Sequence, residues 1–127
     1  MEKIELTQPT ESNRYSLFSE ELENNREVLF HATLKENLSS IKKNGFLSAD
    51  KLGKGVLESV SYAFRSSGCL AHLNGKFGRE YVVFAVKFKT LEIPEITVNI
   101  SDIHVYKGVQ PTEILGYCEL PADFRYS

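Results

Sequence analysis

Three places in this chain of 127 residues hold side chains whose type and position could do chemistry. His31 ends the apolar run 27–32, and an imidazole there could transfer a proton or bind a polar group. The segment Gly55–Ser59 offers glycine backbone and a serine hydroxyl, and Glu113 follows Pro111 at the start of a late strand. Imidazoles and carboxylates are groups that enzymes use for proton transfer and charge stabilisation.

Several common catalytic and binding signatures are absent. The sequence has no GxGxxG loop, no Walker A sequence, no GxSxG elbow and no HExxH pair. Cys69 and Cys118 show neither CxxC spacing nor a cluster with histidine, which argues against a zinc site and leaves one disulfide open. His72 and His104 have no acidic residue at a sequence spacing that would indicate a catalytic pair, so we assign them no role.

Each candidate also has a structural interpretation. A histidine that ends an apolar strand is more often a satisfied structural residue than a site. Glu113 could occupy a polar turn, and Ser59 could be a helix N-cap, an interpretation that we favour slightly. A solvated face explains most of the nearby basic residues, although they could attract a phosphate or a nucleic acid. Lys54 is the best candidate for a phosphate contact, and the others are Lys42, Lys43, Lys51 and Arg65.

The composition is that of a soluble globular protein, with 42% hydrophobic and 25% charged residues. The length fits one domain. No apolar run approaches the roughly 20 residues of a membrane helix, and the polar N-terminus lacks a secretory signal. We therefore expect a cytoplasmic, reduced protein with no membrane partner. The formal charge of −2 does not make the whole chain an attractor for nucleic acid, although a local patch could bind it.

The elements that must position the candidate residues follow from the pattern of apolar positions. Residues 1–26 are mostly polar, and we interpret them as an extension around the core, with a short helix at Ser19–Asn25. Residues 27–127 form the main domain. Its first strand is the run 27–32, which is rich in strand-forming residues and is expected to be buried.

Two helices are expected after this strand. Thr33 and Glu36 match a capping box, and apolar residues recur at helical spacing until Asn44, where glycine follows. A second helix is expected from about Ser59 to His72, with its apolar residues on one face.

Strands dominate the rest of the chain. Tyr81–Phe88 is almost wholly apolar, which predicts a central strand covered on both faces. Three shorter strands follow, and the element order predicts an α+β domain with a largely antiparallel sheet. These shorter strands are Ile96–Ile100, Ile103–Tyr106 and Ile114–Tyr117.

Over residues 27–120 the order of these motifs resembles the PARP-like ADP-ribosyltransferase fold. Leu29–Thr33, followed by a helix that ends in Asn44-Gly45-Phe46, is similar to that family's opening motif. Gly53–Ser59 with Ala63 resembles its second motif. Tyr106–Ile114 resembles the "h-Pro-x-Glu-Ile" ending of small prokaryotic and viral members and of RNA 2′-phosphotransferases.

The resemblance implies a split, mixed sheet with two flanking helices and an NAD site in a cleft between two half-sheets. His31 would hydrogen-bond the adenosine ribose, and the backbone of Ala32 would bind the nicotinamide amide. Glu113 would bind the nicotinamide ribose and stabilise the positive charge that develops as nicotinamide leaves. The other implied cofactor contacts are Thr33, Lys54, Gly55, Leu57, Ser59 and Tyr62.

This sequence departs from the family pattern at two positions. Leu57 stands where PARP-like members carry the aromatic residue that stacks on nicotinamide, and Tyr62 could supply a ring from the following helix at a different offset. Gln110 stands three residues before Glu113, whereas arginine-specific transferases place their extra Gln or Glu two before it. The second departure bears on acceptor specificity more than on fold.

Three functions are compatible with these residues. The first is a small intracellular NAD-dependent ADP-ribosyltransferase that passes ADP-ribose to a protein or nucleic-acid acceptor, as toxins, phage effectors and anti-defence proteins of this fold do. The second is a non-catalytic module that binds NAD, an ADP-ribose-type nucleotide or a protein partner. The third, RNA 2′-phosphotransfer, ranks lower because residues 1–26 do not supply the N-terminal winged-helix part of that family.

Overall fold

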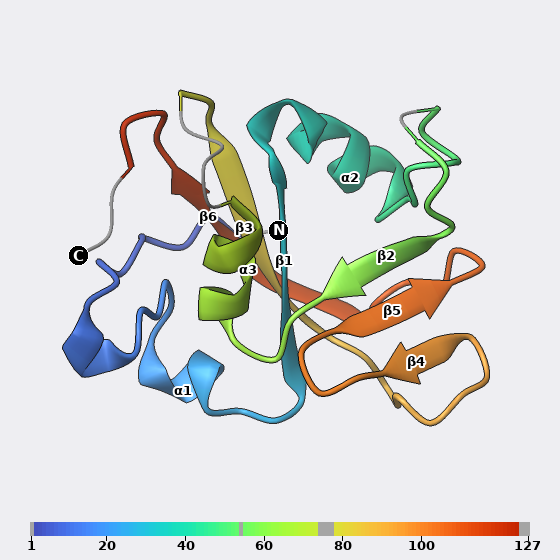
Figure 1. Cartoon of the computed structure of the whole chain (residues 1–127), viewed down its shortest axis with the longest axis horizontal. Helices are drawn as coiled ribbons and strands as arrows, with labels where there is room; N and C mark the ends of the chain where they lie inside the picture. Colours follow the sequence, from blue (N-terminus) through green and yellow to red (C-terminus); the bar gives the residue numbers. More distant parts are fainter. Residues whose placement is uncertain (1, 54, 74–77, 125–127) are drawn as a thin grey trace.

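The structure is a computed structural model, and it describes residues 2–53, 55–73 and 78–124 (Figure 1). Lys54 lies outside the described residues. The chain forms two antiparallel three-stranded sheets with few helices, which confirms the predicted α+β class. The elements are η1 (Glu11–Asn13), α1 (Glu20–Glu23), β1 (Val28–Leu34), η2 (Lys35–Asn37), α2 (Leu38–Asn44), β2 (Ser59–Tyr62), α3 (Ser66–Leu73), β3 (Tyr81–Lys87), β4 (Ile96–Val98), β5 (Ile103–Tyr106) and β6 (Glu113–Leu120).

The first sheet has the strand order β1-β3-β6, so β3 is its central strand. Every β3 residue except Lys87 is buried, which confirms the prediction of a strand covered on both faces. Both neighbours pair antiparallel with β3. Their registers place His31, Phe84 and Tyr117 on one line across the sheet.

The second sheet has the order β2-β5-β4 and is apolar on one face only. Along β2 the burial alternates, with Val60 and Tyr62 buried and the two serines less so. Side chains of a strand alternate between the two faces of its sheet. One face therefore packs on the core, and we call the opposite one the polar face. It carries Ser59, Ser61, Thr97, His104 and Tyr106.

The two sheets meet where β1 passes β2. Phe30 and Ala63 form an isolated antiparallel bridge there, with both backbone N–H···O distances at 2.8 Å. Figure 1 shows the strands of the two sheets running in different directions on either side of this junction. The two sheets are thus joined at this bridge, and His31 of β1 lies next to the junction.

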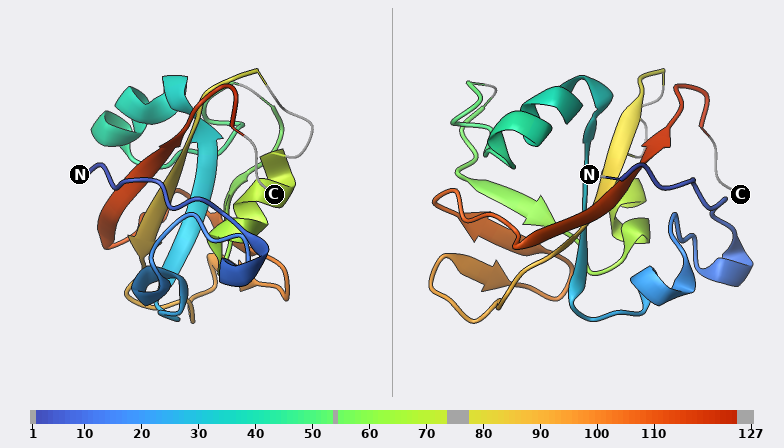
Figure 2. Two further views of the ribbon diagram at one scale, coloured as in Figure 1. Left: turned by 90° about the vertical axis from the view of Figure 1, so that its left-hand side faces the viewer. Right: turned by 180° about the vertical axis from the view of Figure 1, so that it is seen from behind.

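Two apolar cores lie on opposite faces of the β1-β3-β6 sheet (Figure 2). One core is formed with α3 and with Leu17 and Phe18 of the N-terminal segment. The other is formed with α2, Phe46 and the apolar face of the second sheet. Cys69 and Cys118 are both buried in the first core, and both thiols are free.

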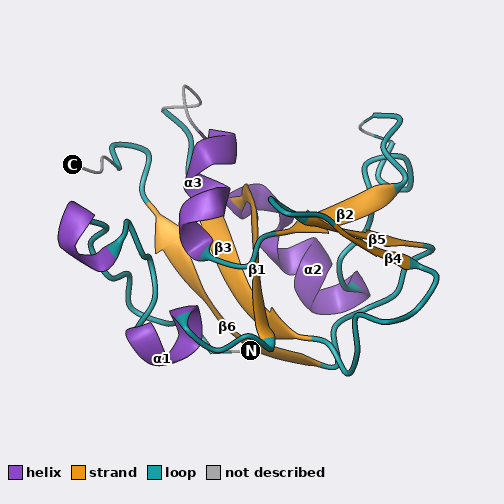
Figure 3. Ribbon diagram, turned by 60° about the horizontal axis from the view of Figure 1, so that its bottom comes forward, coloured by secondary structure: helices purple, strands orange, loops and turns teal. Residues whose placement is uncertain are grey.

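The N-terminal segment is mostly loop with short helical turns (Figure 3), yet it contributes to the core. Leu17 and Phe18 are 0% and 1% exposed. Glu23 of α1 is also buried, and its carboxylate accepts hydrogen bonds from the backbone N–H of Phe18 (3.3 Å) and from the backbone N–H (3.1 Å) and hydroxyl of Ser66. These bonds tie residues 17–23 to the start of α3.

The structure differs from the sequence predictions in the two helices. The expected helix Thr33–Asn44 begins late, because β1 continues to Leu34 and Thr33 pairs with Val82 of β3. The expected helix Ser59–His72 is wrong in its first part. Residues Ser59–Tyr62 are strand β2, and α3 begins only at Ser66. Ser59 is therefore not a helix N-cap.

Most of the strand bounds also differ from the predicted ones, among them those of β4 and β6. β4 ends at Val98 rather than at Ile100, because the backbone N–H of Asn99 turns to donate to the carbonyl of Asp102 at 2.8 Å. β6 runs on to Leu120, three residues beyond the predicted end. Its extension pairs with β3 and carries Cys118 into the first core.

Candidate functional site

His31 lies on the face of β1 that is turned toward α2 and the second sheet. Its Nδ1 is 2.6 Å from the backbone carbonyl oxygen of Ser61 in β2. A carbonyl oxygen only accepts hydrogen bonds, so Nδ1 carries the proton and donates it. When the ring is neutral, Nε2 is the acceptor. This bond fixes the ring at the junction of the two sheets.

Aromatic rings surround His31 in this position. The ring of Phe46 lies 5.3 Å from it, centroid to centroid, and the ring of Tyr62 lies 5.4 Å from it. Tyr62 also contacts Phe46 at 5.8 Å and Phe88 at 5.2 Å, both nearly edge to face. We use the name aromatic cleft for the packed cluster of His31, Phe46, Tyr62 and Phe88.

Tyr62 carries an unusual polar group into this cleft. The residue is 2% exposed, and within the described part of the chain its buried hydroxyl makes no hydrogen bond. Burial raises the pKa of the phenol well above its ordinary value of 10.0, so the group remains a neutral donor. A buried hydroxyl without a partner costs roughly 1–3 kcal/mol. It is a group that a ligand could satisfy.

Phe46 is held in place by Gln110 from the loop before β6. The Gln110 amide accepts from the backbone N–H of Phe46 at 2.8 Å and donates to its carbonyl at 2.7 Å. Gly45 precedes Phe46 with φ +77° and ψ −168°, a conformation that is essentially restricted to glycine. A Cβ at Gly45 would lie 2.8 Å from Cδ of Gln110. Gln110, predicted to bear on acceptor specificity, thus has a structural role beside the cleft.

A small cavity opens beside His31. Its volume is about 40 Å³, and its lining includes Thr33, Phe46 and Leu52. Ligand pockets usually measure some 300–1,000 Å³. The cavity as it stands holds only a few water molecules.

The structure brings three of the predicted site residues together, namely His31, Thr33 and Tyr62. Thr33 lines the small cavity, and its hydroxyl accepts a hydrogen bond from Asn37 at 2.9 Å. Tyr62 reaches His31 from β2, not from a helix as expected. Ala32 adjoins them in the chain, but its side chain packs on the opposite core, and its backbone pairs with Val83.

The other predicted residues lie elsewhere. Gly55 and Leu57 are exposed in the loop before β2, where Leu57 is 65% exposed. Ser59 is on the polar face, away from the aromatic cleft. Glu113 is exposed at the start of β6 and pairs with Lys87, level with Val28 at the opening of β1. The structure therefore does not bring Glu113 to His31.

A hydrogen-bonded chain on the polar face was missed by the sequence analysis. The Ser59 hydroxyl lies 2.9 Å from Nδ1 of His104, and Nε2 of His104 lies 3.0 Å from a carboxylate oxygen of Asp102. Asn99 donates to the other carboxylate oxygen at 3.0 Å. His104 thus has the acid partner that we judged absent. The spacing of two residues between Asp102 and His104 on an alternating strand was the available signal.

Two absences hold for residues 2–53, 55–73 and 78–124. No cluster of three or more His, Cys, Asp or Glu side chains is placed to bind a metal ion. In the same ranges, every helix is too short or too polar to span a bilayer. A comparison with models of protein families, with curated proteins and with solved structures found no match to this chain.

Proposed function

We propose that this chain is a small NAD-binding protein of the ADP-ribosyltransferase type, with its nucleotide site at the aromatic cleft. In the form that we favour, it cleaves the bond between nicotinamide and ribose and transfers ADP-ribose to a macromolecular acceptor. One observation carries the proposal: His31 and Tyr62, from different sheets, meet where these sheets are joined, and the Tyr62 hydroxyl is buried without a described partner.

The chemistry of the cleft suits a nucleotide. Nε2 of His31 accepts hydrogen bonds, which matches the donor hydroxyls of a ribose. The Tyr62 hydroxyl adds a donor and a ring face. The family carries an aromatic residue that stacks on nicotinamide at the position of Leu57. In this chain we assign that stacking role to Tyr62, whose ring lies 5.4 Å from that of His31.

Nucleotide binding requires the cleft to open. A cavity of about 40 Å³ does not admit a dinucleotide, and Leu47 and Leu52 close it on the side of the loop before β2. That loop exposes Val56 and Leu57, which are 90% and 65% exposed. Its displacement would uncover His31 without breaking any strand pair, because residues 47–58 lie between α2 and β2.

The first experiment is calorimetric titration of NAD into the purified protein. We expect saturable binding that His31→Ala weakens at least tenfold, the effect of about 1.4 kcal/mol of lost interaction. His104→Ala is the matched control, because it removes an imidazole from the opposite face of the neighbouring sheet. Equal affinity of the wild type and His31→Ala, or no binding at millimolar NAD, would reject the nucleotide site.

In the transferase form, the family resemblance assigns the transfer step to Glu113, which this structure places away from His31. If the wild-type protein releases nicotinamide from NAD, the Glu113→Gln variant should turn over about 100-fold more slowly, which is the usual effect of removing one group that stabilises the transition state electrostatically. NAD affinity should change little in this variant. Unchanged turnover would remove Glu113 from the mechanism.

A second function has its own observation in favour. Glu113 begins β6, level with Val28 and away from His31, so its carboxylate is not part of the cleft as described. This arrangement favours a non-catalytic module that binds NAD or a related nucleotide. Binding of NAD without release of nicotinamide would select this alternative. A gain of turnover in Leu57→Tyr would instead identify a weakened transferase.

A further inference from the structure

We propose that Ser59 is an activated nucleophile that takes the acyl group of small polar esters, with His104 as its general base and Asp102 as the residue that positions the base. The site is separate from the aromatic cleft. It rests on two consecutive hydrogen bonds, from Ser59 to His104 at 2.9 Å and from His104 to Asp102 at 3.0 Å. A nucleophile, a base within reach and a group that orients the base are the signature of nucleophilic catalysis.

The tautomer of His104 follows from its partners. The carboxylate of Asp102 only accepts hydrogen bonds, so Nε2 of His104 carries the ring proton and donates it. Nδ1 is then a lone-pair acceptor facing the Ser59 hydroxyl. This is the arrangement in which the imidazole can take the serine proton as the oxygen attacks.

The fold makes this geometry rigid. β2 and β5 are paired antiparallel, with Ser59 opposite Tyr106 and Ser61 opposite His104, so Ser59 is a diagonal neighbour of His104 on the same face. Asn99 fixes Asp102 from the other side, through its side-chain amide at 3.0 Å. The side chains of His104 and Asp102 are 29% and 26% exposed, which leaves the array open to a substrate and to water.

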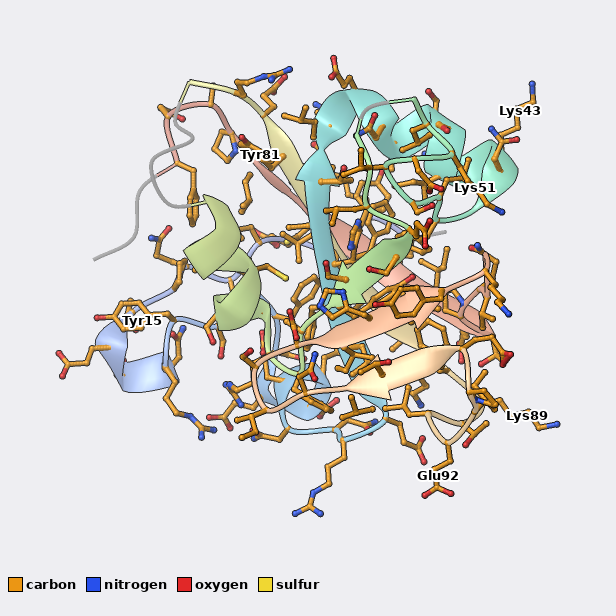
Figure 4. The ribbon with its side chains drawn as sticks, turned by 45° about the vertical axis from the view of Figure 1, so that its right-hand side comes forward. Tyr15, Lys43, Lys51, Tyr81, Lys89 and Glu92 are labelled. Atoms are coloured by element: carbon orange, nitrogen blue, oxygen red, sulfur yellow. The ribbon has the colours of Figure 1, made fainter. Side chains whose placement is uncertain are left out.

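A hollow of about 500 Å³ is lined by residues that neighbour the serine in the chain and in the sheet. Glu58 precedes Ser59 in its wall, and Tyr106, the strand partner of Ser59, forms another part of it. Its lining is charged with both signs: Lys51 and Lys107 are positive, and Asp50, Glu58 and Glu95 are negative. Lys51 extends from the loop between α2 and β2 (Figure 4). The volume suits a small molecule, and the charged lining favours a polar acyl group over a fatty one.

The reaction has two balanced steps. In the first, Oγ of Ser59 bonds to the acyl carbon while its proton moves to Nδ1 of His104. The bond from that carbon to the ester oxygen then breaks, and the proton passes from His104 to the departing alcohol. In the second, water attacks the acyl-serine and gives its proton to His104, which returns it to Oγ of Ser59. The products are an alcohol and a carboxylic acid.

Labelling with a small fluorophosphonate, located by mass spectrometry, tests the proposal on the wild-type protein. Phosphonylation of a serine releases fluoride and depends on the same activation of the hydroxyl. We expect the label on Ser59, and we expect Ser59→Ala to remove it. A label on another serine, or no labelling, would overturn the proposal without any variant.

Variants that keep the serine test its activation. His104→Ala should slow both the labelling of Ser59 and the acetylation of Ser59 by p-nitrophenyl acetate about 100-fold, the usual contribution of a general base. Asp102→Asn should slow both reactions, and Asp102→Glu should restore part of the rate, which a merely structural role would not do. Thr97→Ala is the control, because Thr97 faces His104 from β4 on the same face and is not part of the array. Equal rates in the wild type and in a folded His104→Ala variant would overturn the proposal.

Discussion

Replacing Gly45 by alanine tests how the aromatic cleft is held together. Gly45 has φ +77° and ψ −168°, which an L-residue occupies at a cost of about 1–3 kcal/mol. Its new Cβ would also meet the Gln110 amide, with 2.8 Å to Cδ. The amide must then withdraw from Phe46 and give up two hydrogen bonds, each with a net contribution of about 1 kcal/mol. We expect a total loss of about 3–5 kcal/mol in the free energy of unfolding.

Urea unfolding followed by circular dichroism measures this loss, and a double-mutant cycle separates its two parts. In the Gln110→Ala background the amide is already absent, so Gly45→Ala should cost only the backbone part, about 1–3 kcal/mol. Gly53→Ala is the matched control. Gly53 has φ +69°, and no atom lies within 4 Å of its would-be Cβ, so we expect a cost of about 1–2 kcal/mol. Equal costs for Gly45→Ala in the two backgrounds would refute the described contact with Gln110.

Two further predictions concern titratable groups of the first sheet and of the core that it forms with α3. A hydrogen bond from Lys3, with a further one from Lys35, holds the pKa of Glu119 below its ordinary value of 4.5. This stabilisation is present above that value and is lost as the pH falls through the lower, folded pKa. The stability difference between the wild type and Glu119→Gln should therefore shrink at about pH 3 in thermal unfolding, and a constant difference would contradict it. Burial raises the pKa of Cys118 to about 12 and that of Cys69 further. Neither thiol should react with iodoacetamide at about pH 8 in the folded protein, whereas both should react in urea, and labelling of the folded protein would contradict the burial.

Local apolar pattern was sufficient to predict two strands, one that is covered on both faces and one whose burial alternates. The run that became β3 is apolar at nearly every position because α3 and α2 cover its two faces. A short, continuous apolar run of this kind is typical of a buried strand and not of a helix with one apolar face. β5 was predicted with its correct bounds, because Ile103 and Val105 alternate with less buried neighbours.

The apolar pattern gave a wrong prediction where a short segment fits both the helical period of 3.6 residues and the strand period of two. Val60 and Ala63 are three residues apart and fit a helix face, but Ser59–Tyr62 also alternates, and pairing with β5 decided for the strand. Because the segment was predicted as a helix, the contact between Ser59 and His104 was not predicted either. The two residues are 45 positions apart in the sequence, and only the pairing of β2 with β5 brings them together.

The short strand β2 contributes a residue to each of the two proposed sites. Because side chains alternate along β2, Tyr62 lies in the aromatic cleft and Ser59 lies on the polar face, on opposite sides of the same sheet. A strand with only a structural role would gain stability from Phe at position 62, because the buried hydroxyl of Tyr62 has no described partner and costs roughly 1–3 kcal/mol. Departures of this kind from the most stable choice are expected at functional sites. Because Ser59 and Tyr62 lie on opposite faces of β2, loss of the proposed nucleophile at Ser59 and loss of the proposed nucleotide site at His31 should be separable by mutation.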